Sequence, residues 1–142
     1  PLRLVGSEMC IRDRSKTTMF TSPTFTGTIA GSFGGTVENS FNITASGSSD
    51  YVFAQDDKFF TASTNDPVLY LRRGETYKFI VNASGHPFQI RVSNGGSAYN
   101  TGVTNNTQSN ATITFVVPMS APATLYYQCT AHSGMGNTIN IV

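Results

Sequence analysis

The sequence predicts an all-β fold, a Greek-key β-sandwich of about eight strands. Short stretches in which apolar and polar residues alternate recur from Ser40 to the end of the chain, and this is the pattern of strands with one buried face. Clusters of Gly, Ser, Asn, Asp and Pro separate these stretches, as in two-sheet sandwiches. No stretch has the spacing of an amphipathic helix.

Four strands are predicted between Ser40 and Asn82, each marked by apolar residues at every second position or by a short apolar run. A turn at residues 47–49 separates the first two, Phe59-Phe60 lies in a connection with at most a short strand, and Pro67 marks where the third begins. The apolar positions are Phe41, Ile43 and Ala45, then Tyr51 and Phe53, then Val68 to Leu71, then Tyr77, Phe79 and Val81.

Four more strands are predicted after Gly85. Residues 93–110 are almost wholly Ser, Gly, Asn and Thr, which predicts a long surface or functional loop with Tyr99 and Val103 as its anchors. Gln128 is expected on the opposite face of its strand from Cys129, which therefore points into the interior. The apolar positions are Phe88, Ile90 and Val92, then Ile113, Phe115 and Val117, then Leu125, Tyr127 and Cys129, then Ile139 and Ile141.

The chain has 142 residues, enough for one domain with a core of its own. We expect residues 39–142 to form that domain, and residues 15–38, which are rich in Thr, Ser and Gly, to be a low-complexity linker or disordered tail. Residues 1–14 resemble the translation of a sequencing adapter, so we expect the native N-terminus and any signal peptide to be missing. Without this segment, Cys129 is the only cysteine.

Charge and hydropathy argue against two classes of partner. The formal net charge is +1 and the Lys and Arg residues are scattered, so the chain lacks the basic stripe of a nucleic-acid binder. Its apolar runs are only a few residues long, too short for a membrane-spanning helix.

Residues with metal-binding chemistry fall in two segments. His86 follows the fourth predicted strand, and Cys129, His132 and Met135 lie in the turn between the last two strands. One thiolate, two imidazoles and a thioether form a soft donor set, and a Cys-His-His site with a weak axial Met defines a mononuclear blue-copper centre. Zinc is the less favoured interpretation, because it rarely uses a thioether ligand.

Each of these residues, taken alone, is more often a packing or surface residue than a ligand. The joint pattern favours the ligands, because the strand order brings both segments to one end of the sandwich. A Cys-His nucleophile is disfavoured, since it needs an orienting third group and no Asp or Glu lies near either segment.

Residues from about 40 to 142 resemble the cupredoxins, the blue-copper family of plastocyanin, azurin, pseudoazurin and amicyanin. The resemblance assigns His86, Cys129, His132 and Met135 to one copper ion that alternates between Cu(I) and Cu(II). The spacing Cys-x-x-His-x-x-Met is that of the amicyanin loop. Plastocyanin and pseudoazurin place the Met where this chain has Asn137, which makes the region of Asn137 the alternative axial position.

The resemblance implies one-electron transfer by a carrier that is not an enzyme, because protein ligands leave no open position for a substrate. It also implies a weak, transient complex with a redox partner protein. The partner would dock on an apolar patch around the exposed edge of His132, for which Pro87, Met119, Ala131 and Gly134 are the candidates. We expect a periplasmic or extracellular location.

Two alternatives keep the copper site and change its use. The Thr-, Gly- and Ser-rich leader favours a copper-binding structural or adhesive module of a larger phage or bacterial surface protein. Copper delivery or storage would predict further Met or His clusters, which the sequence lacks.

The hydrogen bond to the cysteine sulfur is a separate prediction. In the family, the residue after the first His commonly donates its backbone N–H to that sulfur. Here that residue is Pro87, which has no N–H. We therefore predict one backbone donor to Cys129 from within the ligand loop, the N–H of Ala131.

Overall fold

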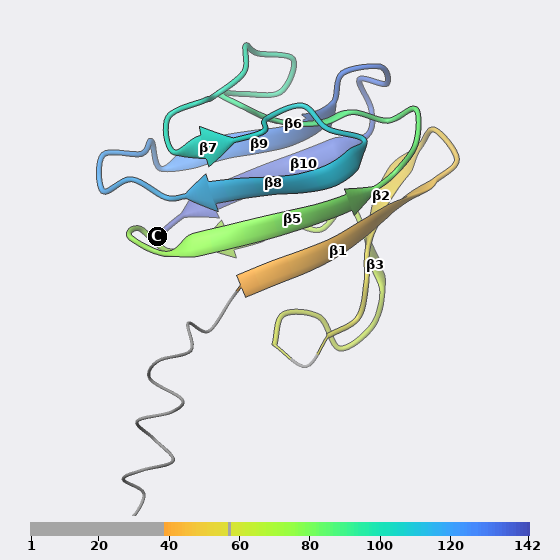
Figure 1. Cartoon of the computed structure of the whole chain (residues 1–142), viewed down its shortest axis with the longest axis horizontal. Coiled ribbons are helices and arrows are strands. Elements are labelled where there is room, and N and C mark those ends of the chain that lie inside the picture. The colour runs from red at the N-terminus through yellow and green to blue at the C-terminus, as the bar shows by residue number, and fades with distance from the viewer. Residues whose placement is uncertain (1–38, 57) are drawn as a thin grey trace, which may run out of the picture. The chain divides into compact units, whose positions relative to one another are not determined.

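A computed structural model of the chain describes residues 39–56 and 58–142, which form ten strands in two sheets that face each other (Figure 1). These residues contain no helix, and so none that could cross a membrane. The predictions for residues 1–14 and 15–38 lie outside the described residues. The strands are β1 (Asn39–Ser46), β2 (Asp50–Phe53), β3 (Thr64–Asn65), β4 (Leu69–Leu71), β5 (Thr76–Asn82), β6 (Phe88–Arg91), β7 (Val103–Thr104), β8 (Asn110–Val116), β9 (Thr124–Cys129) and β10 (Gly136–Ile141).

The six-stranded sheet has the order β3-β2-β1-β5-β8-β7, and the four-stranded sheet has the order β4-β10-β9-β6. The pairs β1/β5 and β4/β10 are parallel, and the other pairs are antiparallel. The chain crosses between the sheets after β3, β4, β5, β6 and β8. The predicted all-β sandwich is therefore confirmed, with ten strands in place of about eight because β3 and β7 are only two residues long.

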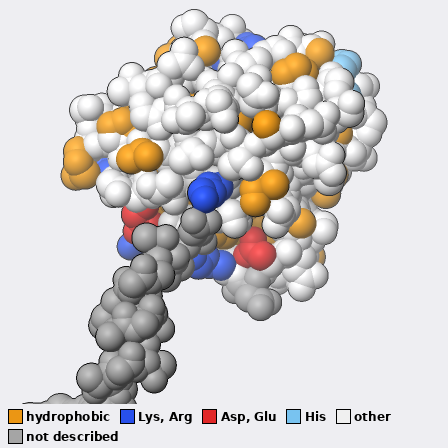
Figure 2. All heavy atoms as spheres, viewed as in Figure 1, with side chains coloured by type: hydrophobic (Ala, Val, Ile, Leu, Met, Phe, Trp, Pro, Cys, Tyr) orange, Lys and Arg blue, Asp and Glu red, His pale blue; other side chains and the backbone are white. Residues whose placement is uncertain are grey.

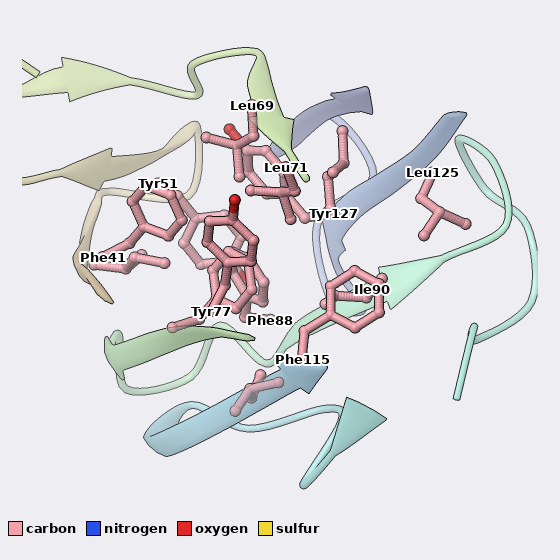
Figure 3. Close-up of a cluster of buried hydrophobic side chains, with 14 of the residues drawn as sticks. Phe41, Tyr51, Leu69, Leu71, Tyr77, Phe88, Ile90, Phe115, Leu125 and Tyr127 are labelled. Carbon is pink, nitrogen blue, oxygen red and sulfur yellow. The ribbon is translucent and has the colours of Figure 1, made fainter. Parts of the chain in front are cut away.

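The core lies between the sheets and is built by the alternation that the sequence predicts. Buried and more exposed positions alternate along β5, so that Tyr77, Phe79 and Val81 point inward. Rings from both sheets meet in the middle, where Phe88 and Tyr127 stack with centroids 5.2 Å apart and Tyr51 approaches Phe88 at 5.1 Å. Figure 3 shows these three rings within the buried cluster.

Two details differ from the sequence prediction. Val92 is 45% exposed, because β6 ends at Arg91 and the chain turns away from the core. Phe59 and Phe60 lie in a connection, as predicted, and both rings pack on Phe41, at 4.7 and 6.0 Å between centroids.

The second difference is in the polar segment 93–110. It contains β7 and two isolated bridges. The Nδ2 of Asn106 also donates hydrogen bonds to the carbonyls of Ile90 and Tyr99. The segment is therefore attached to the edge strand β6 along its length. The predicted anchors Tyr99 and Val103 do pack against the core.

Candidate metal centre

Cys129 is the last residue of β9, and its side chain is buried. It is paired with Phe88 of β6, the second residue after His86, so the sheet register brings the two predicted segments together. The Cys129 N–H donates to the carbonyl of Met135 at 2.9 Å, and the Met135 N–H donates to the carbonyl of His132 at 3.1 Å. These two bonds close the loop that carries the remaining predicted ligands.

His86 lies in the turn between β5 and β6. Gly85 has φ of 84°, a left-handed conformation that glycine adopts without strain. The His86 N–H donates back to the carbonyl of Ala83 at 2.9 Å, and the Ala83 N–H donates to the carbonyl of Ser109, the residue before β8. The turn is thus fixed at both ends, and it holds the His86 ring half-buried.

The structure brings three predicted ligands together. The donor atoms of His86, Cys129 and His132 all lie within 4.8 Å of one another. The Nδ1 atoms of the two histidines are 3.1 Å apart, and the Nδ1 of His132 is 3.7 Å from the Cys129 sulfur. Figure 2 shows histidine side-chain atoms reaching the surface at this end of the domain.

These separations suit one small metal ion. Zinc bonds to imidazole at about 2.0 Å and to thiolate at about 2.3 Å. Bonds of those lengths in a trigonal plane would place two nitrogens about 3.5 Å apart and a nitrogen and a sulfur about 3.7 Å apart, from the same bond lengths. The observed values of 3.1 and 3.7 Å are close to both. In donor type and in these two separations, the residues present therefore fit a Cys-His-His metal site.

Comparison with known proteins gives structural neighbours only. The chain is similar to a pseudoazurin from Sinorhizobium and to rusticyanin. The pseudoazurin is 19% identical with a TM-score of 0.44, and the likeness covers 75% of each chain. A variant of rusticyanin with Met replaced by Gln is 16% identical with a TM-score of 0.40, covering 74% of this chain and 78% of that one. No family model matches the sequence, and neither does any curated protein. The likeness to the amicyanin loop therefore stays a prediction.

Met135 and Asn137 are the two candidates for the fourth position. The Met135 side chain is fully buried within the loop that joins β9 to β10. The Asn137 amide is engaged elsewhere, since its Nδ2 donates to the carbonyl of Asp66 at 2.7 Å and its Oδ1 accepts from the N–H of Thr138. This favours Met135, although its role as a ligand stays a prediction.

The predicted donor to the cysteine sulfur is confirmed. The N–H of Ala131 lies 3.4 Å from the Cys129 sulfur and donates to it. Pro87, which has no N–H, uses its carbonyl to accept the N–H of Thr130 at 3.0 Å. The two ligand segments are therefore bonded to each other beside the sulfur.

An acidic residue does lie beside the ligand loop, contrary to the sequence prediction. One carboxylate oxygen of Asp66 accepts the N–H of Gly136 at 3.1 Å and the other accepts the N–H of Tyr51 at 3.0 Å. Burial raises the pKa of Asp66, although both hydrogen bonds oppose that shift. Sequence reasoning missed this residue because it is far from both segments along the chain.

Gln128 is buried, which alternation alone does not predict, because residues of two loops cover it. Its Oε1 accepts from Arg91 at 3.1 Å and from the N–H of Gly95 at 2.8 Å. Its Nε2 donates to Asn94 at 2.8 Å and to the carbonyl of Ser133 at 2.6 Å. The amide is satisfied on all sides, so its burial is compatible with stability, and it connects the loop after β6 to the ligand loop.

The predicted docking patch is wrong in one member. Met119 is exposed beside the turn before β5, where Arg73 donates to its carbonyl. His86 follows the other end of β5, so Met119 lies at the opposite end of the sandwich from the histidines. Pro87, Ala131 and Gly134 lie in the two ligand segments, and the last two are exposed.

Proposed function

We propose that this domain binds one copper ion through His86, Cys129, His132 and Met135 and acts as a one-electron carrier. The observation that supports the proposal is the convergence of three soft donors, from segments 43 positions apart (129 minus 86), within 4.8 Å of one another. When bound, copper supplies a Cu(I)/Cu(II) couple. Zinc would accept the same three donors, and the buried thioether of Met135 is the reason to prefer copper.

The chain's own residues hold these donors in place before a metal arrives. Hydrogen bonds of the Cys129 and Met135 backbones close the loop, and the Thr130 N–H ties it to the turn of His86. Buried Cys129 and Met135 keep water away from the inner side, while the half-buried His132 offers a route to the surface. Ligands that move little between two oxidation states favour fast electron transfer.

The partner would be a redox protein that docks weakly and transiently over His132. Pro87, Ala131 and Gly134 offer small, uncharged contact positions there. Because all the proposed ligands are protein side chains, no position is left for a substrate, and we propose no catalytic turnover. A periplasmic or extracellular location is part of the same proposal.

Absorption spectroscopy tests the metal and the ligand set together. One equivalent of Cu(II) added to the metal-free protein should give an intense thiolate-to-copper band in the visible region. Cys129→Ser should abolish the band, whereas Thr130→Ser, a matched change at the exposed neighbouring side chain, should keep it. Stoichiometric copper binding without colour would overturn the proposal, and so would a coloured Cys129→Ser protein.

Voltammetry separates the electron carrier from a structural copper module. A carrier should show a reversible one-electron wave, because its ligands are fixed in advance. A module that binds copper only for stability would show slow or irreversible exchange, and that result would refute the carrier function while leaving the copper site intact.

A further inference from the structure

Asp66 lies where the chain crosses from the six-stranded sheet to the four-stranded sheet, between β3 and β4. Its backbone N–H donates to the carbonyl of Tyr51 in β2 at 2.8 Å, and one of its carboxylate oxygens accepts the Tyr51 N–H at 3.0 Å. Its other carboxylate oxygen accepts the N–H of Gly136 in β10 at 3.1 Å, and its carbonyl accepts from the Asn137 amide at 2.7 Å. Asp66 therefore joins one strand of each sheet.

Both strands that Asp66 joins lie next to a candidate ligand. Gly136 directly follows Met135 along the chain. On the other side, Tyr51 gives the single proton of its hydroxyl to the carbonyl of His86 at 2.9 Å. The link from Met135 through Asp66 to the turn of His86 thus consists of hydrogen bonds within the protein, and no metal takes part in it.

The local chemistry of Asp66 suits this position. Its φ is 39°, in the left-handed region that Asp and Asn tolerate better than most residues. Its side chain is half-buried, and an ionised carboxylate offers only acceptors, whose hydrogen bonds from N–H groups are stronger than those of neutral acceptors. The next residue, Pro67, is held as well, because the buried hydroxyl of Tyr127 donates to its carbonyl at 2.7 Å.

We propose that Asp66 is a positioning residue of the metal centre, which fixes the backbone that carries Met135 relative to the His86 turn. This inference rests on the proposed copper function, with Met135 as the axial ligand. An axial thioether is a weak, long ligand of copper, so the protein must hold it in place. Because a thioether donates electron density to the metal, a Met135 that is held less firmly should favour Cu(I) and raise the reduction potential.

Asp66→Asn breaks the link while keeping the size of the side chain and its tolerance of the left-handed backbone. Whichever way the new amide turns, its NH2 group faces one of the two backbone N–H groups, so either β2 or β10 loses its acceptor. With copper bound, voltammetry should show a raised reduction potential. The shift should correspond to a gain of up to about tenfold in the preference for Cu(I), the size of one ordinary hydrogen bond.

Removing a negative charge near the metal also raises the potential, so two comparisons isolate the positioning effect. Asp50→Asn is the matched control, because it removes the same charge from the first residue of β2, which is outside the link, and its shift should be smaller. In a Met135→Leu background, which lacks the thioether, Asp66→Asn should raise the potential no more than Asp50→Asn does. An Asp66→Asn shift of full size in that background would mean that the charge alone acts, and would overturn the inference.

Amide hydrogen exchange in the metal-free full chain tests the link without copper. The Gly136 N–H should exchange more slowly than the N–H of the exposed Gly134, and the difference should shrink in Asp66→Asn. Asp66→Gly, which removes the carboxylate and adopts a positive φ without strain, should have the same effect. The wild-type rates do not depend on whether either variant folds, and equal rates at the two glycines would overturn the inference.

The outcomes separate this inference from the copper proposal. A coloured wild type whose potential is unchanged in Asp66→Asn, or changes no more than in Asp50→Asn, overturns the positioning role and leaves the copper function standing. A wild type that stays colourless with copper refutes the proposed function and the effect on the potential together. Slow exchange at Gly136 would then still support Asp66 as the residue that holds the loop, and fast exchange would refute that as well.

Discussion

Gly136 is the position where a single added methyl group should do most damage to the ligand loop. It is the first residue of β10, directly after Met135, and has φ of 138°. A Cβ at this position would lie 2.1 Å from the carbonyl oxygen of Tyr127 and 2.7 Å from the Cα of Gln128. Both are backbone atoms of the paired strand β9, so neither can yield as the end of a flexible side chain could.

Two effects set the expected cost of Gly136→Ala. A non-glycine residue in a sparsely populated backbone region costs about 1–3 kcal/mol. Forcing extra volume into a packed region costs about 1–3 kcal/mol more. The two costs act together and add to about 2–6 kcal/mol, so we expect the free energy of unfolding to fall by about 4 kcal/mol, the middle of that range. At about 4–8 °C for each kcal/mol, Tm should fall by about 16 °C or more.

Gly134→Ala is the matched control in the same loop. Gly134 is exposed, is not among the glycines with positive φ, and an added Cβ would meet no atom within 4 Å. Replacing such a glycine stabilises a protein by up to about 1 kcal/mol, because the unfolded chain loses freedom.

Urea denaturation of the metal-free proteins compares the two variants without any contribution from bound copper. A Gly136→Ala protein within about 0.5 kcal/mol of wild type, the ordinary range for surface substitutions, would refute the steric reasoning. So would equal effects of the two substitutions. In copper titrations, Gly134→Ala should keep the visible band, while Gly136→Ala should bind more weakly because the loop around Met135 is displaced.

Three further predictions concern the surroundings of the site. Met135→Leu should cost less than about 1.5 kcal/mol in urea denaturation, because the volume is nearly conserved, and should still bind copper with a raised potential; an unchanged potential would argue against Met135 as the axial ligand. Ala131→Pro should lower the potential in voltammetry by removing the N–H that lies 3.4 Å from the Cys129 sulfur, and Pro87→Asn should raise it; two unchanged potentials would contradict this tuning. Burial raises the pKa of Asp66, so the folded protein holds that proton more tightly than the unfolded chain does. The free energy of unfolding of the metal-free wild type, minus that of Asp66→Asn, should therefore fall as the pH rises from about 3.9 through the folded pKa. A difference that increases over this pH window would refute the raised pKa.

The strands of the core could be predicted from the sequence because alternation directly reports which side chains are buried. Phe41 and Ile43 in β1, and Ile113 and Phe115 in β8, are all buried as the pattern requires. Alternation alone does not predict the burial of Gln128. Its burial depends on hydrogen-bond partners from two distant loops, and periodicity carries no information about such partners.

The grouping of His86, Cys129 and His132 could be predicted for a different reason. Soft donors are rare in this chain, and their types restrict the metal before any geometry is known. The polar segment 93–110 was predicted to be a surface or functional loop, and Asn106 bonds it to β6: its Oδ1 accepts the N–H of Ile90 and its Nδ2 donates to the carbonyl of Ile90. A polar composition alone does not distinguish a loose loop from one that is held by side-chain hydrogen bonds.

The residues that connect the ligand segments could not be found in the sequence, yet they bear most directly on how the site would work. The Gly136 N–H donates to Asp66, the same carboxylate accepts the N–H of Tyr51, and the hydroxyl of Tyr51 donates to the carbonyl of His86. This chain of hydrogen bonds joins four positions that are widely separated along the sequence and links the end of the ligand loop to the turn of the first histidine. It needs no metal to form. The donor atoms are therefore held close together by the protein itself, and a metal ion that changes its charge would meet ligands whose positions are already fixed by the fold.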